Sequence, residues 1–168
     1  GGSPNGSQFN KIYFRAIHSN YVQIRLSTKG TTSASGNWNN ESFWYGGQLG
    51  RGIPGTTYGK GGWYGIMIVR ESTSNSKAMN GHMFHDIGFE GLEIGIKASY
   101  AEHNSFIGGG FEQQGVRKGI DLDPATCIGN KFIGLTFLEE QMFVSGRLGT
   151  NTVIEGTPFW TGPVPDIV

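Results

Sequence analysis

The sequence predicts an all-β fold of short strands, and three observations point to it. Glycine supplies 29 of the 168 residues, whereas charged residues make up only 15% of the chain. Typical shares are about 7% for glycine and about 25% for charged residues, so the composition disfavours helical bundles and coiled coils. Short segments alternate apolar and polar residues between turns rich in glycine, asparagine and serine, which is the pattern of half-buried strands.

The alternation is clearest over residues 21–26 and 92–98. Turn-forming residues bound the predicted strands, as at residues 72–75 and 108–110. No window of the sequence predicts a helix of three turns. We therefore expect strands joined by tight turns throughout a single domain.

Apolar residues recur at fixed intervals, which indicates a structural repeat. Each copy has an apolar anchor, with further apolar residues five and ten places later. The anchors are Ile12, Phe84, Phe106 and Phe132, the residues five places later are Ile17, Phe89, Phe111 and Phe137, and those ten places later are Val22, Ile94, Val116 and Met142. We interpret Phe43 and Val153 as the anchors of two further copies. Phe84, Phe106, Phe132 and Val153 are 22, 26 and 21 residues apart, about one coil of a parallel β-helix.

A polar residue lies two places before most of these anchors. These residues are Asn10, His82, Asn104, Asn130 and Asn151, and Asn40 precedes Phe43. Coils of a parallel β-helix stack about 4.8 Å apart, so the polar side chains would form a ladder that hydrogen-bonds the turn backbone and the next coil. An antiparallel sandwich also uses short strands and glycine-rich turns. It does not explain the fixed offsets, so we predict the parallel β-helix.

Three segments carry a resemblance to a known family. Residues 104–112 (NSFIGGGFE), 130–134 (NKFIG) and 40–49 (NESFWYGGQL) resemble coils of the right-handed β-helix in the pectate-lyase-like superfamily, and most of all those of bacteriophage tailspike and tail-fibre proteins. The resemblance covers roughly residues 10–155. It implies a single-stranded solenoid, a fragment of a longer homotrimeric virion spike that acts outside the cell on bacterial host surface polysaccharide. No catalytic signature of the superfamily matches, so no catalytic residue is inferred from it.

The chain divides into three predicted parts. Residues 1–9 form a flexible segment or a cloning remnant, residues 10–157 form the β-helix domain with an aromatic loop insertion around residues 50–64, and residues 158–168 form an extended C-terminal tail. Thirteen basic and thirteen acidic residues give zero net charge, which disfavours nucleic acid as a partner. No apolar run is long enough to insert into a membrane. The single cysteine, Cys127, excludes an internal disulfide.

Two acidic residues are the candidates for catalysis. Glu90 and Glu112 each follow a predicted core residue by one place, so on adjacent coils they would project about 4.8 Å apart. That separation is near the ~5–5.5 Å of the carboxylates in retaining glycosidases. The alternative is a solvated edge on which the two carboxylates diverge or pair with basic residues.

The candidates for substrate binding are aromatic residues in and around the insertion. They are Trp38, Trp44, Tyr45, Trp63 and Tyr64, together with Arg51. Rings can lie against sugar faces while short polar groups bond the hydroxyls. The alternative is that the rings cover the hydrophobic core or pack against another subunit.

We predict no metal and no cofactor. His82 and His85 have opposite parity on a predicted strand, so their side chains would point to opposite faces. Residues 50–55 match the glycine spacing of a dinucleotide-binding turn, but no helix follows to receive a pyrophosphate. The function predicted is recognition of host polysaccharide during phage adsorption. The alternatives are a depolymerase, hydrolase or lyase, that cleaves the same glycan, and a non-catalytic stalk or adhesin passenger.

Overall fold

A computed structural model describes residues 7–18, 21–28, 39–50, 64–70, 79–111, 118–137 and 149–156. Within these ranges the regular elements are all β-strands, and every strand pairing is parallel. No helix in the described part of the chain could cross a membrane. The predicted all-β class is therefore confirmed.

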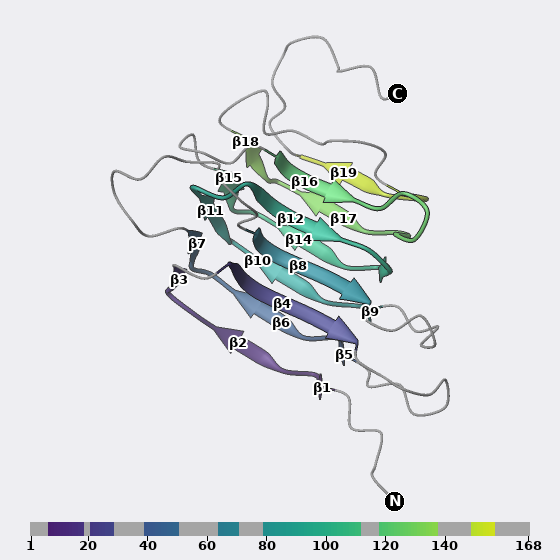
Figure 1. The fold of residues 1–168 in the computed structure, drawn as a ribbon, viewed down its shortest axis with the longest axis horizontal. Coiled ribbons are helices and arrows are strands. Elements are labelled where there is room, and N and C mark those ends of the chain that lie inside the picture. The colour runs from purple at the N-terminus through teal and green to yellow at the C-terminus, as the bar shows by residue number, and fades with distance from the viewer. Residues whose placement is uncertain are drawn as a thin grey trace, which may run out of the picture.

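Three larger sheets and two short ones contain all the strands (Figure 1). The six-stranded sheet comprises β2 (Lys11–Tyr13), β6 (Phe43–Tyr45), β10 (Met83–His85), β14 (Ser105–Ile107), β17 (Lys131–Ile133) and β19 (Val153–Glu155). The five-stranded sheet comprises β3 (Ala16–His18), β7 (Gln48–Gly50), β11 (Gly88–Glu90), β15 (Gly110–Phe111) and β18 (Thr136–Phe137). The four-stranded sheet comprises β4 (Val22–Thr28), β8 (Tyr64–Arg70), β12 (Ile94–Ala98) and β16 (Lys118–Leu122). The short sheets pair β1 (Ser7–Gln8) with β5 (Asn39–Asn40), and β9 (Met79–Asn80) with β13 (Ala101–Glu102).

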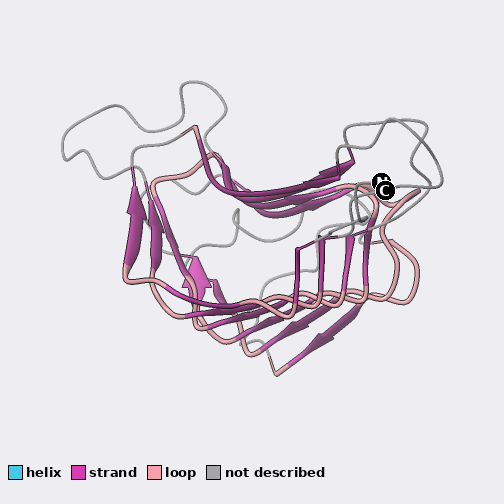
Figure 2. Ribbon diagram, turned by 90° about the horizontal axis from the view of Figure 1, so that it is seen from below, coloured by secondary structure: helices cyan, strands magenta, loops and turns pink. Residues whose placement is uncertain are grey.

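The chain visits these sheets in a fixed order. We call a passage each run of chain that gives one strand to the six-, five- and four-stranded sheets in turn. The first passage covers residues 7–28, the second 39–70, the third 79–98 and the fourth 101–122, and residues 128–137 and 150–155 continue the series. Each strand pairs with its counterpart in the next passage, so the passages lie in layers around a shared interior (Figure 2).

Two aromatic stacks run through the interior. The rings of Phe84, Phe106 and Phe132 are parallel, with centroids 4.8 and 5.0 Å apart. A second stack, Phe89, Phe111 and Phe137, has centroid spacings of 4.6 and 4.7 Å. Both columns are the predicted ones, and their inward packing is confirmed by near-complete burial of all but the half-buried Phe137.

Two predicted anchors are wrong by one residue. Trp44, not Phe43, pairs with Ile12 and Phe84, and Ile154, not Val153, pairs with Phe132. The reason lies in the preceding turns. Ser42 and Thr152, rather than Asn40 and Asn151, hold the ladder position there, and the anchor follows that position by two residues in every layer.

The third column is confirmed only in part. Val22 pairs with Tyr64, and Tyr64 pairs with Ile94, but Ile94 pairs with Lys118 in the next passage. Lys118 lies two residues beyond the predicted Val116 because it follows Phe111 by seven residues, whereas Ile94 follows Phe89 by five. Val116 and Met142 themselves lie outside the described residues.

The predicted polar ladder is present and buried. The amide oxygen of Asn104 accepts the backbone N–H of His82 at 3.0 Å, and that of Asn130 accepts the backbone N–H of Asn104 at 3.2 Å. The Asn104 amide nitrogen donates to the Asn130 side chain at 3.0 Å and to the Met79 carbonyl at 3.1 Å. In the second passage Ser42, rather than Asn40, occupies the ladder position. The ladder satisfies turn backbone groups that would otherwise be buried without partners.

The turn just before the ladder explains part of the glycine content. In six successive layers the residue preceding the ladder position has a φ between 52° and 69°. These residues are Phe9, Glu41, Gly81, His103, Gly129 and Asn151. Glycine adopts this left-handed conformation without a steric penalty, and it fills two of the six positions, Gly81 and Gly129.

Candidate functional site

Four of the residues predicted for the site, Trp38, Arg51, Trp63 and Glu112, lie outside the described residues. The other four, Trp44, Tyr45, Tyr64 and Glu90, belong to strands of all three large sheets. The structure does not gather them on one surface.

Trp44 lies on the interior side of β6. Its ring is parallel to that of Phe84, with centroids 5.9 Å apart, and it packs against the buried core. Its indole nitrogen is buried and has no hydrogen-bond partner among the described residues. This position matches the alternative in which the rings of the insertion cover the hydrophobic core.

Tyr45 follows Trp44 and therefore faces the other side of β6. Its ring is stacked between those of Tyr13 and His85, with centroid distances of 4.9 and 5.3 Å. Tyr13, at the end of this row, exposes 71% of its surface. Because the neighbouring rings cover both faces of Tyr45, this residue presents only its edge and hydroxyl to solvent.

Glu90 ends β11 in the five-stranded sheet. Its carboxylate accepts a hydrogen bond from the side-chain amide of Gln48, on the neighbouring strand β7. The described contact of Glu90 is thus an uncharged amide. The other member of the predicted carboxylate pair, Glu112, lies outside the described residues.

Tyr64 belongs to a different group of side chains, at the start of the four-stranded sheet. Its backbone N–H donates to the Tyr21 carbonyl at 2.9 Å. The two rings meet edge to face, with centroids 5.6 Å apart and an interplanar angle of 78°. An edge-to-face pair leaves the faces of the edge-donating ring uncovered by its partner.

Lys97 and Glu93 complete this group from the third passage. The Lys97 ammonium lies 5.2 Å from the centroid of the Tyr64 ring, within the range of a cation–π interaction. The pKa of the Tyr21 hydroxyl is raised, first by partial removal from water and then by the neighbouring Tyr64 phenol and the Glu93 carboxylate. Lys97 acts in the opposite direction and lowers this pKa. We call Tyr21, Tyr64, Glu93 and Lys97 the tyrosine cluster.

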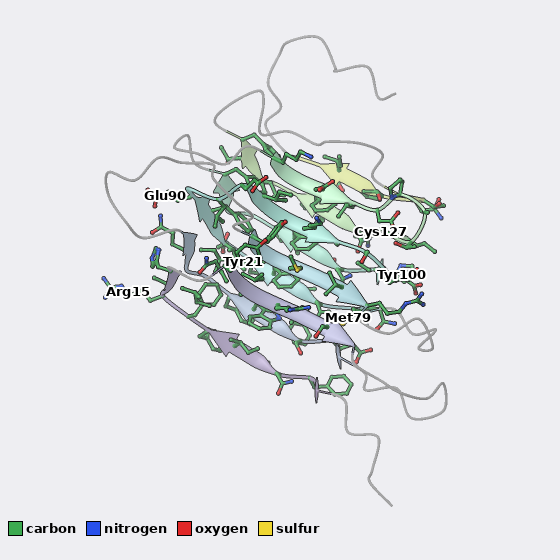
Figure 3. All side chains as sticks on the ribbon, in the orientation of Figure 1. Arg15, Tyr21, Met79, Glu90, Tyr100 and Cys127 are labelled. Atoms are coloured by element: carbon green, nitrogen blue, oxygen red, sulfur yellow. The ribbon has the colours of Figure 1, made fainter. Side chains whose placement is uncertain are left out.

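The tyrosine cluster lies at an accessible edge of the molecule. Tyr21 exposes 58% of its surface, and the other three members are partly exposed. Figure 3 places Tyr21 where the strands of the four-stranded sheet begin, and Tyr100 where they end. The cluster combines ring faces with phenol, carboxylate and ammonium groups, so it could contact both the apolar and the hydroxyl surfaces of a sugar.

Sequence reasoning identified Tyr64 but missed Tyr21, Glu93 and Lys97. The available signal was position, since Tyr21 and Glu93 lie at the beginning of the predicted strands over residues 21–26 and 92–98. Placing Tyr21 beside Tyr64 required the pairing of β4 with β8, and that pairing spans the insertion.

The prediction that His82 and His85 point to opposite faces is confirmed. His82 is buried in the polar ladder, whereas His85 stacks on Tyr45 at the outer face. Among the residues that the structure describes, no three His, Cys, Asp or Glu side chains are grouped to hold a metal ion.

No family model, no curated protein and no solved structure matches this chain.

Proposed function

We propose that the chain is a right-handed parallel β-helix module of a bacteriophage tailspike or tail fibre, and that it binds bacterial surface polysaccharide outside the cell. Two observations support the β-helix: parallel pairing of each strand with its counterpart one passage later, and continuous side-chain columns through the interior. The sequence resemblance of residues 10–155 supports the phage spike.

The observation that carries the binding function is the tyrosine cluster. Polysaccharide-binding surfaces need ring faces that are open to solvent and polar groups beside them. Tyr21 and Tyr64 meet edge to face, with Lys97 beside the Tyr64 ring. The row of Tyr13, Tyr45 and His85 is a weaker candidate because stacking covers both faces of Tyr45 and one face each of Tyr13 and His85.

The contacts of the tyrosine cluster support recognition. Glycoside hydrolysis needs a second carboxyl group at a defined distance from the first. The described partner of Glu90 is the Gln48 amide, which can orient a carboxylate but cannot act as acid or nucleophile. The depolymerase remains the enzymatic alternative.

An array of purified bacterial capsular and O-chain polysaccharides tests the proposal. We expect the full chain to bind at least one polymer, and Tyr64→Ala to weaken that binding about tenfold, which corresponds to ~1.4 kcal/mol. Tyr13→Ala is the matched control, since it removes an exposed tyrosine from a different sheet, and its affinity should stay within about twofold.

The same samples separate the alternatives. The length of each bound polymer, measured by size exclusion after prolonged incubation, should not change. Shortening of the polymer would identify a depolymerase. Absence of binding to every polymer would favour the non-catalytic stalk.

We also propose that the module is a homotrimer. The sequence resemblance supports the trimer, and the described strands at both ends of the three large sheets pair on one side only, an arrangement that natural proteins cover or pair. Light scattering coupled to size exclusion should give three times the chain mass of 18.2 kDa. A monomer that persists at high concentration would contradict the trimer.

A further inference from the structure

His82 occupies a ladder position that asparagine fills in the next two layers. The side chain is 1% exposed, and its backbone N–H donates to the Asn104 side chain at 3.0 Å. Its Nδ1 atom accepts the backbone N–H of Ser42 at 3.4 Å. His82 therefore joins the third passage to the second, as Asn104 and Asn130 join later passages.

The contact with Ser42 requires a neutral imidazole. Nδ1 can accept a hydrogen bond only while it carries a lone pair, which places the ring proton on Nε2. A second proton would turn Nδ1 into a donor directed at another donor, the Ser42 N–H. Asparagine has no such titration, so Asn104 and Asn130 keep their contacts at any ordinary pH.

Among the described residues, an aromatic ring lies beside His82 and titratable side chains lie on the adjoining turns. The Phe84 ring lies 6.3 Å from the imidazole, centroid to centroid. On the adjoining turns the titratable residues are Glu41 in the second passage and Glu102 and His103 in the fourth. Glu41 and His103 are exposed, and Glu102 is partly exposed. In the third passage His85 points to the outer face, stacked on Tyr45, and Asp86 in the following turn is exposed.

We propose that His82 makes the junction between the second and third passages sensitive to acid. Protonation breaks the Ser42–His82 contact in a buried layer, so mild acid loosens this junction before the later ones. Tyr64 lies on the second passage and Lys97 on the third, so the tyrosine cluster spans the junction. The acid sensitivity itself does not depend on whether the cluster binds a saccharide.

Urea unfolding of the full chain between pH 7.5 and 5 tests the proposal. Histidine in an unfolded chain titrates near ~6.5, whereas the fold holds His82 neutral, so the unfolded state binds more protons below that pH. The unfolding equilibrium constant should then rise up to about tenfold per pH unit below ~6.5 in the parent chain. In His82→Asn the unfolding equilibrium constant should rise less on acidification, by up to about tenfold per pH unit below ~6.5.

His103→Asn is the matched control, because it removes an exposed histidine next to the same ladder. It should keep the parent's pH dependence. An equal pH dependence in the parent and His82→Asn would overturn the proposal. If Glu41→Gln abolished the effect, the acid sensitivity would belong to that carboxylate and not to His82.

Hydrogen exchange in the parent chain gives a second readout that needs no variant. After correction for the intrinsic pH dependence of exchange, the Ser42 amide should lose protection as the pH falls from 7 to 5.5. The Asn104 amide, bonded to Asn130, should keep its protection. Equal changes at both amides, or none at either, would contradict a local effect of His82.

Discussion

Single residues fix how closely the sheets pack, and Gly95 is the clearest case. A Cβ atom on Gly95 would lie 2.3 Å from the Phe111 ring and 2.8 Å from the Gly119 carbonyl oxygen. A Cβ atom on Gly65, in the layer before, would lie 2.7 Å from the Phe89 ring. The absence of a side chain on the four-stranded sheet therefore makes room for the second phenylalanine stack.

We predict that Gly95→Ala destabilises the fold by about 3 kcal/mol, because neither the ring nor the backbone oxygen can move freely in a packed interior. Gly134→Ala is the control. Gly134 has a φ of 63° but no atom within 4 Å of the added Cβ, so backbone strain alone should cost about 1 kcal/mol. Urea unfolding of both variants measures the difference, and equal losses would contradict the close packing.

Cys127 gives a prediction about reactivity. Its side chain is fully buried, with Sγ 3.5 Å from the Ala98 carbonyl oxygen, and burial raises the pKa of the thiol. Since the thiolate is the reactive form, native Cys127 should react with Ellman's reagent at least about 100-fold more slowly than in concentrated urea, from pH 7 to 9.

Val153→Cys in the Cys127→Ser background supplies the control for reactivity. Val153 is 40% exposed, so a thiol there should react rapidly in the native state and faster as the pH rises. Rapid native reaction of Cys127 would show that this part of the interior is open.

At the scale of the elements, stability resides in columns that run across strands. Phe106 contacts Phe84 on one side and Phe132 on the other, each in a parallel ring stack. Phe106→Ala empties one layer of this column, and we expect a loss of about 3–5 kcal/mol.

Ile107→Ala tests the opposite face of the same strand. Ile107 is half-buried on the outer side of β14, so its truncation should cost about 1 kcal/mol. Urea midpoints of the two variants should differ accordingly. A parental midpoint for Phe106→Ala would refute the column.

The elements were predictable where the turns have constant length. The step from Phe84 to Phe89 equals that from Phe106 to Phe111 because the turn between the six- and five-stranded sheets is the same in both passages. The prediction of Val153 as an anchor is wrong because it places an asparagine at the ladder position. Thr152 fills that position, while Asn151 takes the left-handed turn.

At the scale of the whole molecule, the site was harder to predict than the fold. Alternation predicts which face of a strand is buried, and this suffices to place Phe84 or His85. It does not say which residues of distant passages become neighbours once an insertion separates them. The ring centroids of Tyr21 and Tyr64 are 5.6 Å apart, but the two residues lie on opposite sides of the longest interruption in the repeat. Only the strand register brings them together.

The most direct test is a nuclear magnetic resonance titration of the isotopically labelled chain with an oligosaccharide from the polymer that it binds best. We predict intermolecular Overhauser contacts from the sugar to the rings of Tyr21 and Tyr64, with shift changes at Lys97. The Tyr13 and Tyr45 resonances should remain unchanged. Contacts confined to Tyr13 and Tyr45, or to residues remote from both groups, would contradict the tyrosine cluster as the recognition site.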